Sequence, residues 1–300
     1  MAENLNYADS YAQSLVTLWD ENLYFKALYA SKNNGRFRWS GGKAVQISNI
    51  TTGGRVDADR DTIDTAQRNY DNNWETKNLT HHRKWSTLIH PLDIDQTNYA
   101  LNIENITRAY NVNEKFPEMD AYMVSKLFTD WNAIEGNTAD ATALNEGNIL
   151  EVFDSMMKKM NEARVPFHGR ILYVTPDAMN LIKNAEQLSH TLDVRDSKNG
   201  ISRTVSSIDG VEIVMVPSVL MQSAYNFENG WEKAEGATQI QMMLVHPDAV
   251  IAPISYQFAQ LDPPGAFTEG KYIYFEESCE DVFIINSKAS AIQFATGEIA

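Results

Sequence analysis

Cysteine is almost absent from this 300-residue chain, because Cys279 is its only copy. A single cysteine excludes an intrachain disulfide framework and fits synthesis in a reducing compartment. Long apolar runs are also missing, so we expect no segment that crosses a membrane. The first residues lack the basic and apolar segments of a secretory signal, and we expect no such signal.

Basic residues are outnumbered, since 25 Lys and Arg stand against 40 Asp and Glu, for a net charge of −15 at pH 7. A protein that grips phosphate backbones over a broad surface is expected to be basic. Direct nucleic-acid binding is therefore not expected as the main role, although an acidic protein can still enclose nucleic acid. With 43% hydrophobic residues, the chain is long enough for one or two domains with their own cores.

Convergent sets of catalytic or metal-binding residues are missing as well. Residues 57–61 begin like a calcium loop, but the positions that require Gly and Glu hold Thr and Arg. Gly41-Gly42-Lys43 lacks the other residues of a phosphate loop. His81 and His82 are adjacent, so on a strand they point to opposite faces and cannot share a metal. We therefore predict no catalytic residue, no metal site, no cofactor and no enzyme activity.

The most distinctive stretch runs from residue 39 to residue 90. Trp39–Gly54 and Asn73–Trp85 are strand-like, because β-branched and aromatic residues alternate with polar ones. The charged segment Asp57–Asp64 interrupts both patterns. The sequence predicts a long antiparallel two-stranded arm with a charged tip.

This arm is too long to be covered by its own subunit. At ~3.3 Å per residue, strands of fifteen to twenty residues reach about 50–65 Å, whereas a compact body of this length has a radius of gyration near ~19 Å. The arm also lacks a continuous apolar face, and an isolated two-stranded ribbon is marginal in water. We therefore expect the arm to lie on a neighbouring copy of the chain.

The remaining chain mixes helices and strands. Apolar residues at helical spacing predict helices at about 1–30, 95–110, 117–134 and 146–164. The first of these either docks on its own subunit or packs against a neighbour. β-Type segments are expected at 170–174, 211–216, 239–245, 272–275, 281–285 and 291–294, with a helix starting after Thr175. Residues 256–267, which contain Pro263-Pro264-Gly265, are expected to form an irregular connection.

In this order, the elements resemble the major capsid proteins of tailed bacteriophages, which have the HK97-like fold. The order of several structural segments carries the resemblance, and no single chemical motif does. The segments that resemble parts of that family are Trp39–Ile47, Asp59–Asp61, Trp74–Thr76, Pro91–Thr97, Pro117–Tyr122 and Gly169–Pro176.

The resemblance implies an α+β fold, and it covers nearly the whole chain. It implies an N-terminal arm, an extended β-hairpin loop, a peripheral domain with a long spine helix, an axial α/β domain, and C-terminal strands that return between the two domains. The corresponding ranges are 1–38, 39–90, 91–145, 146–265 and 266–300.

The resemblance also implies a function and partners. Many copies would assemble as pentamers and hexamers into an icosahedral shell in the host cytoplasm. The shell would enclose phage double-stranded DNA without sequence-specific binding. Separate scaffolding proteins and a portal would be partners, and no membrane would be involved. An acidic inner face would let DNA slide during filling, which is a hypothesis about where the charge lies. Covalent crosslinking of a Lys to an Asn is known in the family. Lys43 and Lys77 are possible donors by their position alone, so we expect no crosslink in this protein.

The residues expected to contact neighbouring subunits lie mostly in the long arm and its tip. They are Trp19, Trp39, Lys43, Arg55, Asp57, Asp59, Arg60, Asp61, Trp74, Lys77 and Arg83.

Three other interpretations of the sequence stay open. An encapsulin-type compartment shares the fold and encloses cargo enzymes. A soluble α/β enzyme would hold a pocket within residues 146–300. A different viral structural protein, such as a tail component, is disfavoured by the helix-rich centre of the chain.

Overall fold

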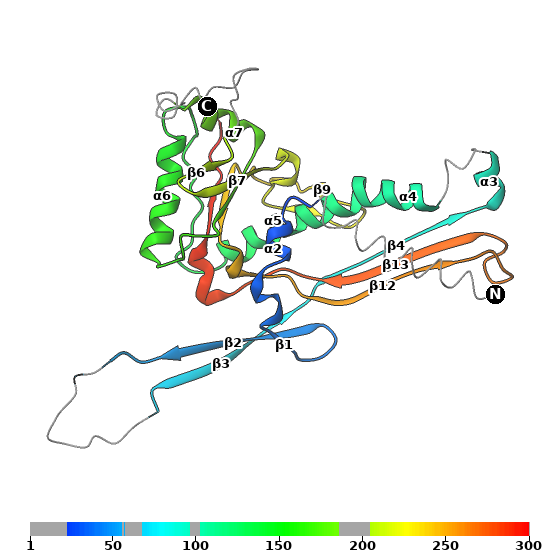
Figure 1. Cartoon of the computed structure of the whole chain (residues 1–300), viewed down its shortest axis with the longest axis horizontal. Helices are drawn as coiled ribbons and strands as arrows, with labels where there is room; N and C mark the ends of the chain where they lie inside the picture. The colour runs from blue at the N-terminus through cyan, green and yellow to red at the C-terminus, as the bar shows by residue number, and fades with distance from the viewer. Residues whose placement is uncertain (1–22, 56, 58–67, 97–102, 186–204, 300) are drawn as a thin grey trace, which may run out of the picture.

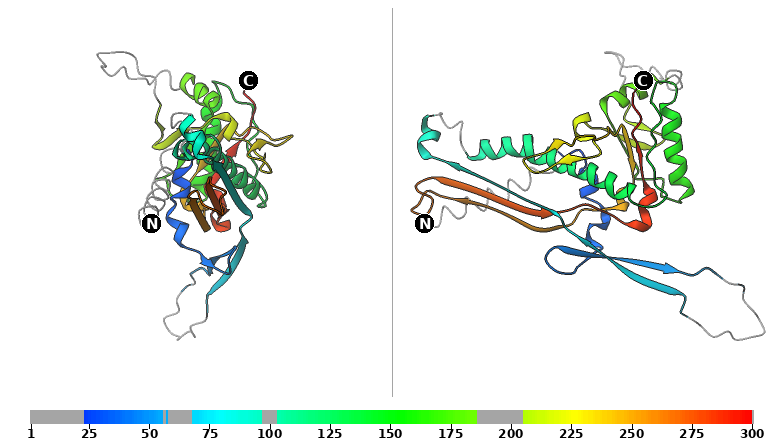
Figure 2. Two further views of the ribbon diagram at one scale, coloured as in Figure 1. Left: turned by 90° about the vertical axis from the view of Figure 1, so that its right-hand side faces the viewer. Right: turned by 180° about the vertical axis from the view of Figure 1, so that it is seen from behind.

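The computed structural model describes residues 23–55, 57, 68–96, 103–185 and 205–299. Figure 1 shows an α/β body at one end, from which a long helix and a long three-stranded sheet extend side by side. A thin β-ribbon leaves the molecule in another direction, and both views in Figure 2 show it projecting away from the rest. No helix in these ranges is long and apolar enough to cross a membrane.

A five-stranded sheet forms the centre of the α/β body. Its strand order is β15-β10-β5-β7-β6. Among the neighbouring strands, only the pair β5 and β7 is parallel, and the other pairs are antiparallel. The strands are β5 (Ile171–Val174), β6 (Ser207–Ile208), β7 (Val211–Met215), β10 (Met242–Val245) and β15 (Ile292–Ala295).

Both faces of this sheet are covered. In β5, Ile171 and Tyr173 join one apolar cluster while Leu172 and Val174 join another, as the two-residue period of a strand requires. Helices α6 (Ile149–Glu162) and α7 (Pro176–Asn184) contribute to the second cluster. The predicted cap of α7 is confirmed, because Thr175 Oγ1 accepts a hydrogen bond from the N–H of Ala178 at 3.3 Å.

A long helical run covers the first cluster and extends beyond the body. It consists of α4 (Ile103–Tyr110), a π-helical turn (η3, Asn111–Lys115) and α5 (Phe116–Asn132). Of the apolar stripe expected along the helix predicted at 117–134, Met119, Met123, Leu127 and Trp131 are buried on α5. Its last member, Ile134, lies beyond the end of α5 and is only partly buried. Pro117 lies in the first turn of α5, where its missing N–H is tolerated, and the π turn joins the two helices into one run.

A long sheet of order β12-β13-β4 lies beside this helical run (Figure 1). Its strands are β4 (His81–Ile89), β12 (Ile254–Asp262) and β13 (Tyr272–Glu280). The expectation of an irregular connection at 256–267 is wrong for its first half, which belongs to β12. Apolar residues alternate there with polar ones, and the proline pair only ends the strand.

The projecting ribbon consists of β2 (Ala44–Thr52) and β3 (Tyr70–Asn78), with the short β1 (Arg38–Trp39) on the outer side of β2. The antiparallel register pairs Ala44 with Asn78 and Thr52 with Tyr70. The predicted return strand 73–85 is wrong in one respect, because the chain leaves the ribbon after Asn78 and pairs with β13 from His81 onward.

Short elements complete the described chain. They are α2 (Lys26–Tyr29), η2 (Lys32–Gly35), α3 (Pro91–Gln96), η4 (Ser218–Leu220), β8 (Tyr225–Asn226), β9 (Glu232–Lys233), η5 (Pro247–Ala249), β11 (Val250–Ile251), β14 (Phe283–Ile284) and η6 (Asn286–Ala291). Most of the helix predicted at 1–30 lies outside the described residues, and the expected end near residue 31 matches the end of α2.

Candidate functional site

The ribbon is divided into a buried root and an exposed outer half. On β2, Val45 is 0% exposed and Ile47 is buried, whereas Ile50 is 64% exposed. On β3, Tyr70 and Trp74 are exposed. The two-residue period of a strand puts Ile50 on the opposite face of β2 from Val45 and Ile47, and the register places Trp74 and Tyr70 on the face of Ile50. The subunit therefore leaves the large apolar side chains of that face exposed.

Polar contacts between its strands hold the outer ribbon together. Ser48 Oγ donates a hydrogen bond to Asn72 Oδ1 at 2.8 Å, and the guanidinium of Arg38 lies 4.5 Å from the ring centroid of Trp74. Cross-strand pairs of this kind stabilise each register position by less than ~1 kcal/mol. The ribbon thus keeps its shape without an apolar core of its own.

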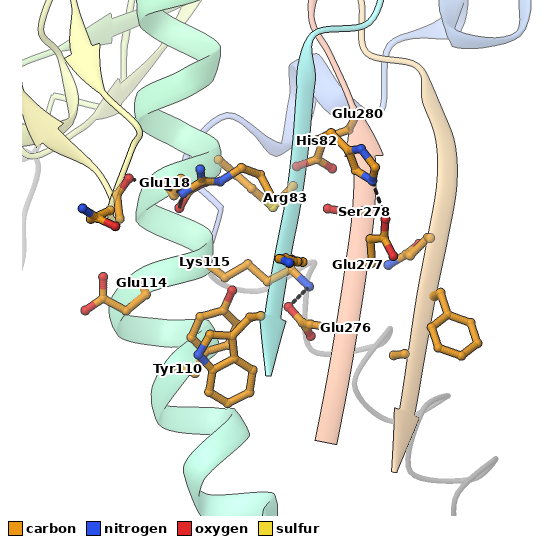
Figure 3. A pocket seen from close by; sticks show the side chains of 18 of the residues that line it. His82, Arg83, Tyr110, Glu114, Lys115, Glu118, Glu276, Glu277, Ser278 and Glu280 are labelled. Carbon is orange, nitrogen blue, oxygen red and sulfur yellow. Dashed lines mark hydrogen bonds and ion pairs between the residues drawn. The ribbon is translucent and has the colours of Figure 1, made fainter. Parts of the chain in front are cut away.

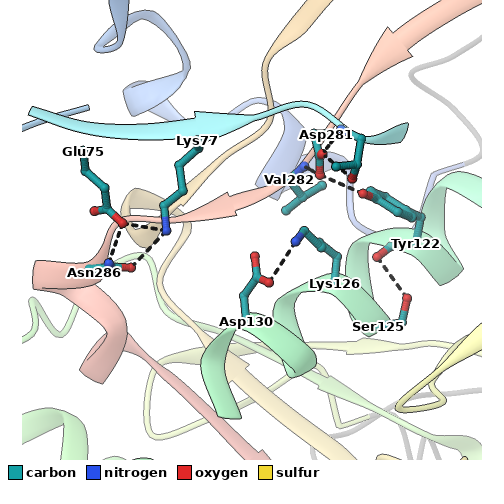
Figure 4. A network of polar contacts seen from close by, with 10 residues as sticks. Glu75, Lys77, Tyr122, Ser125, Lys126, Asp130, Asp281, Val282 and Asn286 are labelled. Carbon is teal, nitrogen blue, oxygen red and sulfur yellow. Dashed lines mark hydrogen bonds and ion pairs between the residues drawn. The ribbon is translucent and has the colours of Figure 1, made fainter. Parts of the chain in front are cut away.

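The root of the ribbon is attached to the C-terminal part of the chain. Val45 and Leu79 pack against Cys279 and Phe283 in a small apolar cluster. Beside this cluster the side chains of Glu75, Lys77 and Asn286 form the triangle shown in Figure 4. Its three contacts measure 2.8 Å from Lys77 to Glu75, 3.4 Å from Lys77 to Asn286, and 2.6 Å from Asn286 to Glu75.

Most of the predicted contact residues that the structure describes are on the ribbon surface. Trp39, Arg55, Asp57 and Trp74 are exposed. Lys43 lies 3.1 Å from His82 Nδ1 across the ribbon root. Four of the predicted residues lie outside the described residues, namely Trp19, Asp59, Arg60 and Asp61. The role of all these residues in contacts between subunits stays a prediction.

Arg83 differs from the other candidates for contacts between subunits, because its side chain forms ion pairs and hydrogen bonds within its own subunit. Its guanidinium contacts both carboxylate oxygens of Glu118, at 2.5 and 3.1 Å, and donates to the carbonyl oxygen of Phe227 at 2.5 Å. The nearby ring of His81, 3.6 Å from Glu118, is neutral near pH 7, since burial and then Arg83 lower its pKa to about 4. Arg83 therefore links β4 to α5 and to the loop around residue 227.

An acidic pocket lies between the helical run and the long sheet. It has a volume of about 530 Å³ and is lined by α4, η3, α5 and all three strands of the sheet. Figure 3 shows Tyr110, Lys115 and Glu118 of the helical run on one side of it, and Arg83 and Glu276 of the sheet on the other. Lys115 lies 3.0 Å from Glu276, and His82 lies 2.5 Å from Glu277.

Glu280 is the most deeply buried acid of this pocket, with 7% of its surface exposed. Its Oε2 atom has no hydrogen-bond partner among the described residues. Burial raises the pKa of this carboxyl to about 7, against the opposing effect of Lys115. A buried carboxylate with a free oxygen is costly unless a cation or a proton reaches it.

Sequence reasoning did not identify the acids that connect the elements. Asp120 on α5 accepts hydrogen bonds from the N–H groups of Tyr24 and Phe25, at 3.1 and 3.3 Å. These bonds attach the segment around residue 24 to α5. Glu280 and Asp281 follow Glu276 and Glu277 closely in the chain, and this accumulation of acids among strand-forming residues was the available signal. Among the described residues, no three His, Cys, Asp or Glu are placed to hold a metal ion.

No protein-family model and no curated protein matches the sequence. Solved structures do resemble this fold. A structure from Mycobacterium phage Che8 matches with a TM-score of 0.61 and 12% identity, over 92% of this chain and 91% of that one. The mature capsid of bacteriophage PhiM1 matches with a TM-score of 0.64 and 12% identity, over 85% and 82%.

The capsid of the cyanophage P-SCSP1u gives a similar result, with a TM-score of 0.60 and 13% identity, over 87% of this chain and 85% of that one. At such low identity the likeness concerns the fold. It extends over at least 85% of this chain in each of the three matches. The chain therefore has the α+β, HK97-like capsid fold of tailed-phage shells, with an extended β-hairpin loop, a spine helix and an axial α/β domain.

Proposed function

We propose that this protein is the major capsid protein of a tailed bacteriophage. Copies of the chain assemble as pentamers and hexamers into an icosahedral shell that encloses double-stranded DNA without reading its sequence. The role is structural, with no catalytic step and no cofactor. The protein is then found in the virion, after assembly in the cytoplasm of the host.

The exposed outer half of the ribbon is the observation that carries this proposal. Ile50, Tyr70 and Trp74 are large apolar side chains on a two-stranded ribbon that the subunit covers only at its root. Such a ribbon gains stability when its exposed side chains are buried against another surface. A neighbouring copy supplies that surface at every position of a closed shell.

Likeness to capsid structures supports the same function. The matches to the Che8 and P-SCSP1u structures span at least 85% of this chain and of the other chains. Matches over most of both chains are expected of a whole shell subunit. Scaffolding and portal proteins are the expected assembly partners.

Expression of the full chain followed by size-exclusion chromatography and negative-stain microscopy tests the proposal. Closed shells of uniform size are expected. A matched variant replaces residues 46–76 by Asn-Gly, which favours a tight hairpin turn between Val45 and Lys77. This variant should fold and elute as a small species that forms no shell.

A compact monomer of the unmodified chain in every assembly condition would refute the shell function. Purified shells that contain a cargo enzyme, with no portal and no DNA, would instead identify the encapsulin-type compartment considered from the sequence. The contents of shells isolated from the native host therefore separate the two containers.

A further inference from the structure

The acidic pocket between the helical run and the long sheet carries more negative than positive charge. Six glutamates line it, against three lysine or arginine side chains. Three of these acids have charged or imidazole partners within the subunit, since Glu118 contacts Arg83, Glu276 contacts Lys115 and Glu277 contacts His82. The acids without an ion-pair partner among the described residues are Glu114, Glu228 and Glu280.

Glu280 differs from the other two acids because it is buried. Glu114 and Glu228 are exposed, so water solvates them. The Glu280 side chain lines the pocket, and its Oε2 atom is left without a donor. An ionised carboxylate in that position is stabilised strongly by a donor that also carries positive charge.

An aromatic wall lies beside these acids. The rings of Trp85 and Tyr110 are stacked with centroids 3.9 Å apart and nearly parallel planes, and both residues line the pocket. Aromatic faces attract cations, and a partly desolvated site strengthens this attraction. Carboxylates combined with aromatic rings suit the binding of an organic cation.

A divalent metal ion fits the pocket less well. No group of three acidic, His or Cys side chains in the described part of the chain is close enough to hold one. Each of Glu118, Glu276 and Glu277 is also engaged by a basic or imidazole group. An extended cation that reaches separate carboxylates does not need such a cluster.

We propose that this pocket binds a primary ammonium or guanidinium group, with the carboxylate of Glu280 as its buried partner and the exposed Glu114 and Glu228 as further acidic contacts. The cation has two possible sources with the same chemistry. It is either a free amine, such as a diamine, or a lysine or arginine side chain of a second copy of the chain. Only the second source rests on the proposed shell function.

Calorimetric titration of the unassembled full chain with 1,5-diaminopentane at pH 8 tests the site itself. Binding at one site per chain is expected, whereas 1,5-pentanediol, which has the same length and no charge, should not bind. Glu280→Gln and Glu114→Gln each remove one negative charge and keep the side-chain size. We expect Glu280→Gln to raise the Kd by about tenfold, which is the scale of one charge-assisted hydrogen bond.

Glu151→Gln is the matched control, because Glu151 is an exposed acid on α6 that does not line the pocket. It should bind the diamine with the same Kd as the unchanged chain. Absence of diamine binding, or an equal Kd in all four proteins, would overturn the proposal. Glu114→Gln keeps the test valid if Glu280→Gln does not fold.

Repeating the titration on assembled shells separates the two sources. If a side chain of a second copy fills the pocket, shells will not bind the diamine although the unassembled chain does. If the natural occupant is a free amine, dialysed shells and the unassembled chain will bind it alike. Failure of the chain to assemble would refute the shell function and leave the first titration intact as a test of the pocket.

Discussion

The hydroxyl of Tyr122 on the spine helix donates a 2.7 Å hydrogen bond to the carboxylate of Asp281, the residue that follows β13 (Figure 4). Asp281 is 1% exposed. Its carboxylate also accepts hydrogen bonds from the N–H and hydroxyl of Thr80, at 2.7 and 3.1 Å, and from the N–H of Val282 at 2.7 Å. One side chain thus joins the spine helix, the C-terminal strands and the link between ribbon and long sheet.

Asp281→Ala is expected to lower the free energy of unfolding of the unassembled chain by about 2–4 kcal/mol, because it leaves several buried donors unpaired. Tyr122→Phe removes one bond and should cost about 1 kcal/mol. Urea denaturation measures both. Asp130→Ala is the control, since Asp130 has only a solvent-accessible pair with Lys126 at 2.8 Å and should cost less than ~0.5 kcal/mol. A similar loss in the Asp281 and Asp130 variants would contradict the central role of Asp281.

Stability should fall as the pH rises from acidic to neutral values because of Glu280. Burial raises its pKa in the folded chain from 4.5 to about 7, with Glu118, Glu276 and Asp281 adding to the effect and Lys115 opposing it. The folded chain therefore keeps a proton that the unfolded chain has lost. The resulting stabilisation is complete below about pH 4.5 and is lost as the pH rises through about 7.

Denaturation at pH 4.5 and pH 8 measures this contribution. In Glu280→Gln the difference between the two free energies of unfolding should shrink by on the order of 2 kcal/mol. Asp120 predicts an effect of the same sign, because burial raises its pKa to about 7 while its two backbone hydrogen bonds lower it. Identical pH profiles for the unchanged chain and Glu280→Gln would show that this carboxyl does not bind its proton more tightly when folded.

The two ends of β2 should respond differently to substitution. Ile50→Ser changes a side chain that is 64% exposed, so the stability of the unassembled chain should change by less than ~0.5 kcal/mol. Shell formation should nevertheless need a higher protein concentration, as measured by light scattering. Val45→Ala on the same strand removes buried methyl groups and should cost about 1–2 kcal/mol in the unassembled chain itself. Assembly of Ile50→Ser at the unchanged concentration would show that the outer ribbon is not buried on a neighbour.

Gly297→Ala should be strongly destabilising. A Cβ atom at this position would lie 1.7 Å from the carbonyl oxygen of Thr142, so the backbone must move. We expect a loss of about 3 kcal/mol or more, measured by thermal denaturation. Gly42→Ala is the control, because an added Cβ meets no atom within 4 Å there and the change should be nearly neutral. Equal melting temperatures for the two variants would be inconsistent with the close approach at Gly297.

The unassembled chain should bind duplex DNA only weakly, because its net charge is −15. In a gel-shift experiment at 150 mM salt, no complex is expected up to roughly 10 μM protein, a range in which non-specific binding proteins bind. A micromolar complex that dissolves at higher salt would indicate a basic surface strong enough to hold DNA, and would argue against an acidic inner face.

Local patterns in the sequence predicted much of the fold. The stripe from Met119 to Trp131 has a helical period, and it is the buried face of α5. The ribbon strands were predicted from alternation, but their end was not. No Gly or Pro marks a break between Asn78 and Trp85. At the change of partner, Thr80 is held by Asp281, which is 201 positions further along the chain. The strand β12 was missed because the proline pair that follows it suggested a loop.

The single cysteine, the large acidic excess, the helical centre and the existence of a two-stranded ribbon were all accessible from the amino-acid order. The ribbon strands are shorter than expected, with nine residues each. Cysteine content and net charge follow from composition alone, and helices and strands follow from a periodicity between residues a few positions apart. Three features became visible only in the folded chain: the end of the ribbon, the pairing of Arg83 with Glu118, and the burial of Glu280 beside a pocket with one carboxylate oxygen unpaired. These features arise where distant segments meet, and no local pattern encodes the charges and donors that one segment finds on another.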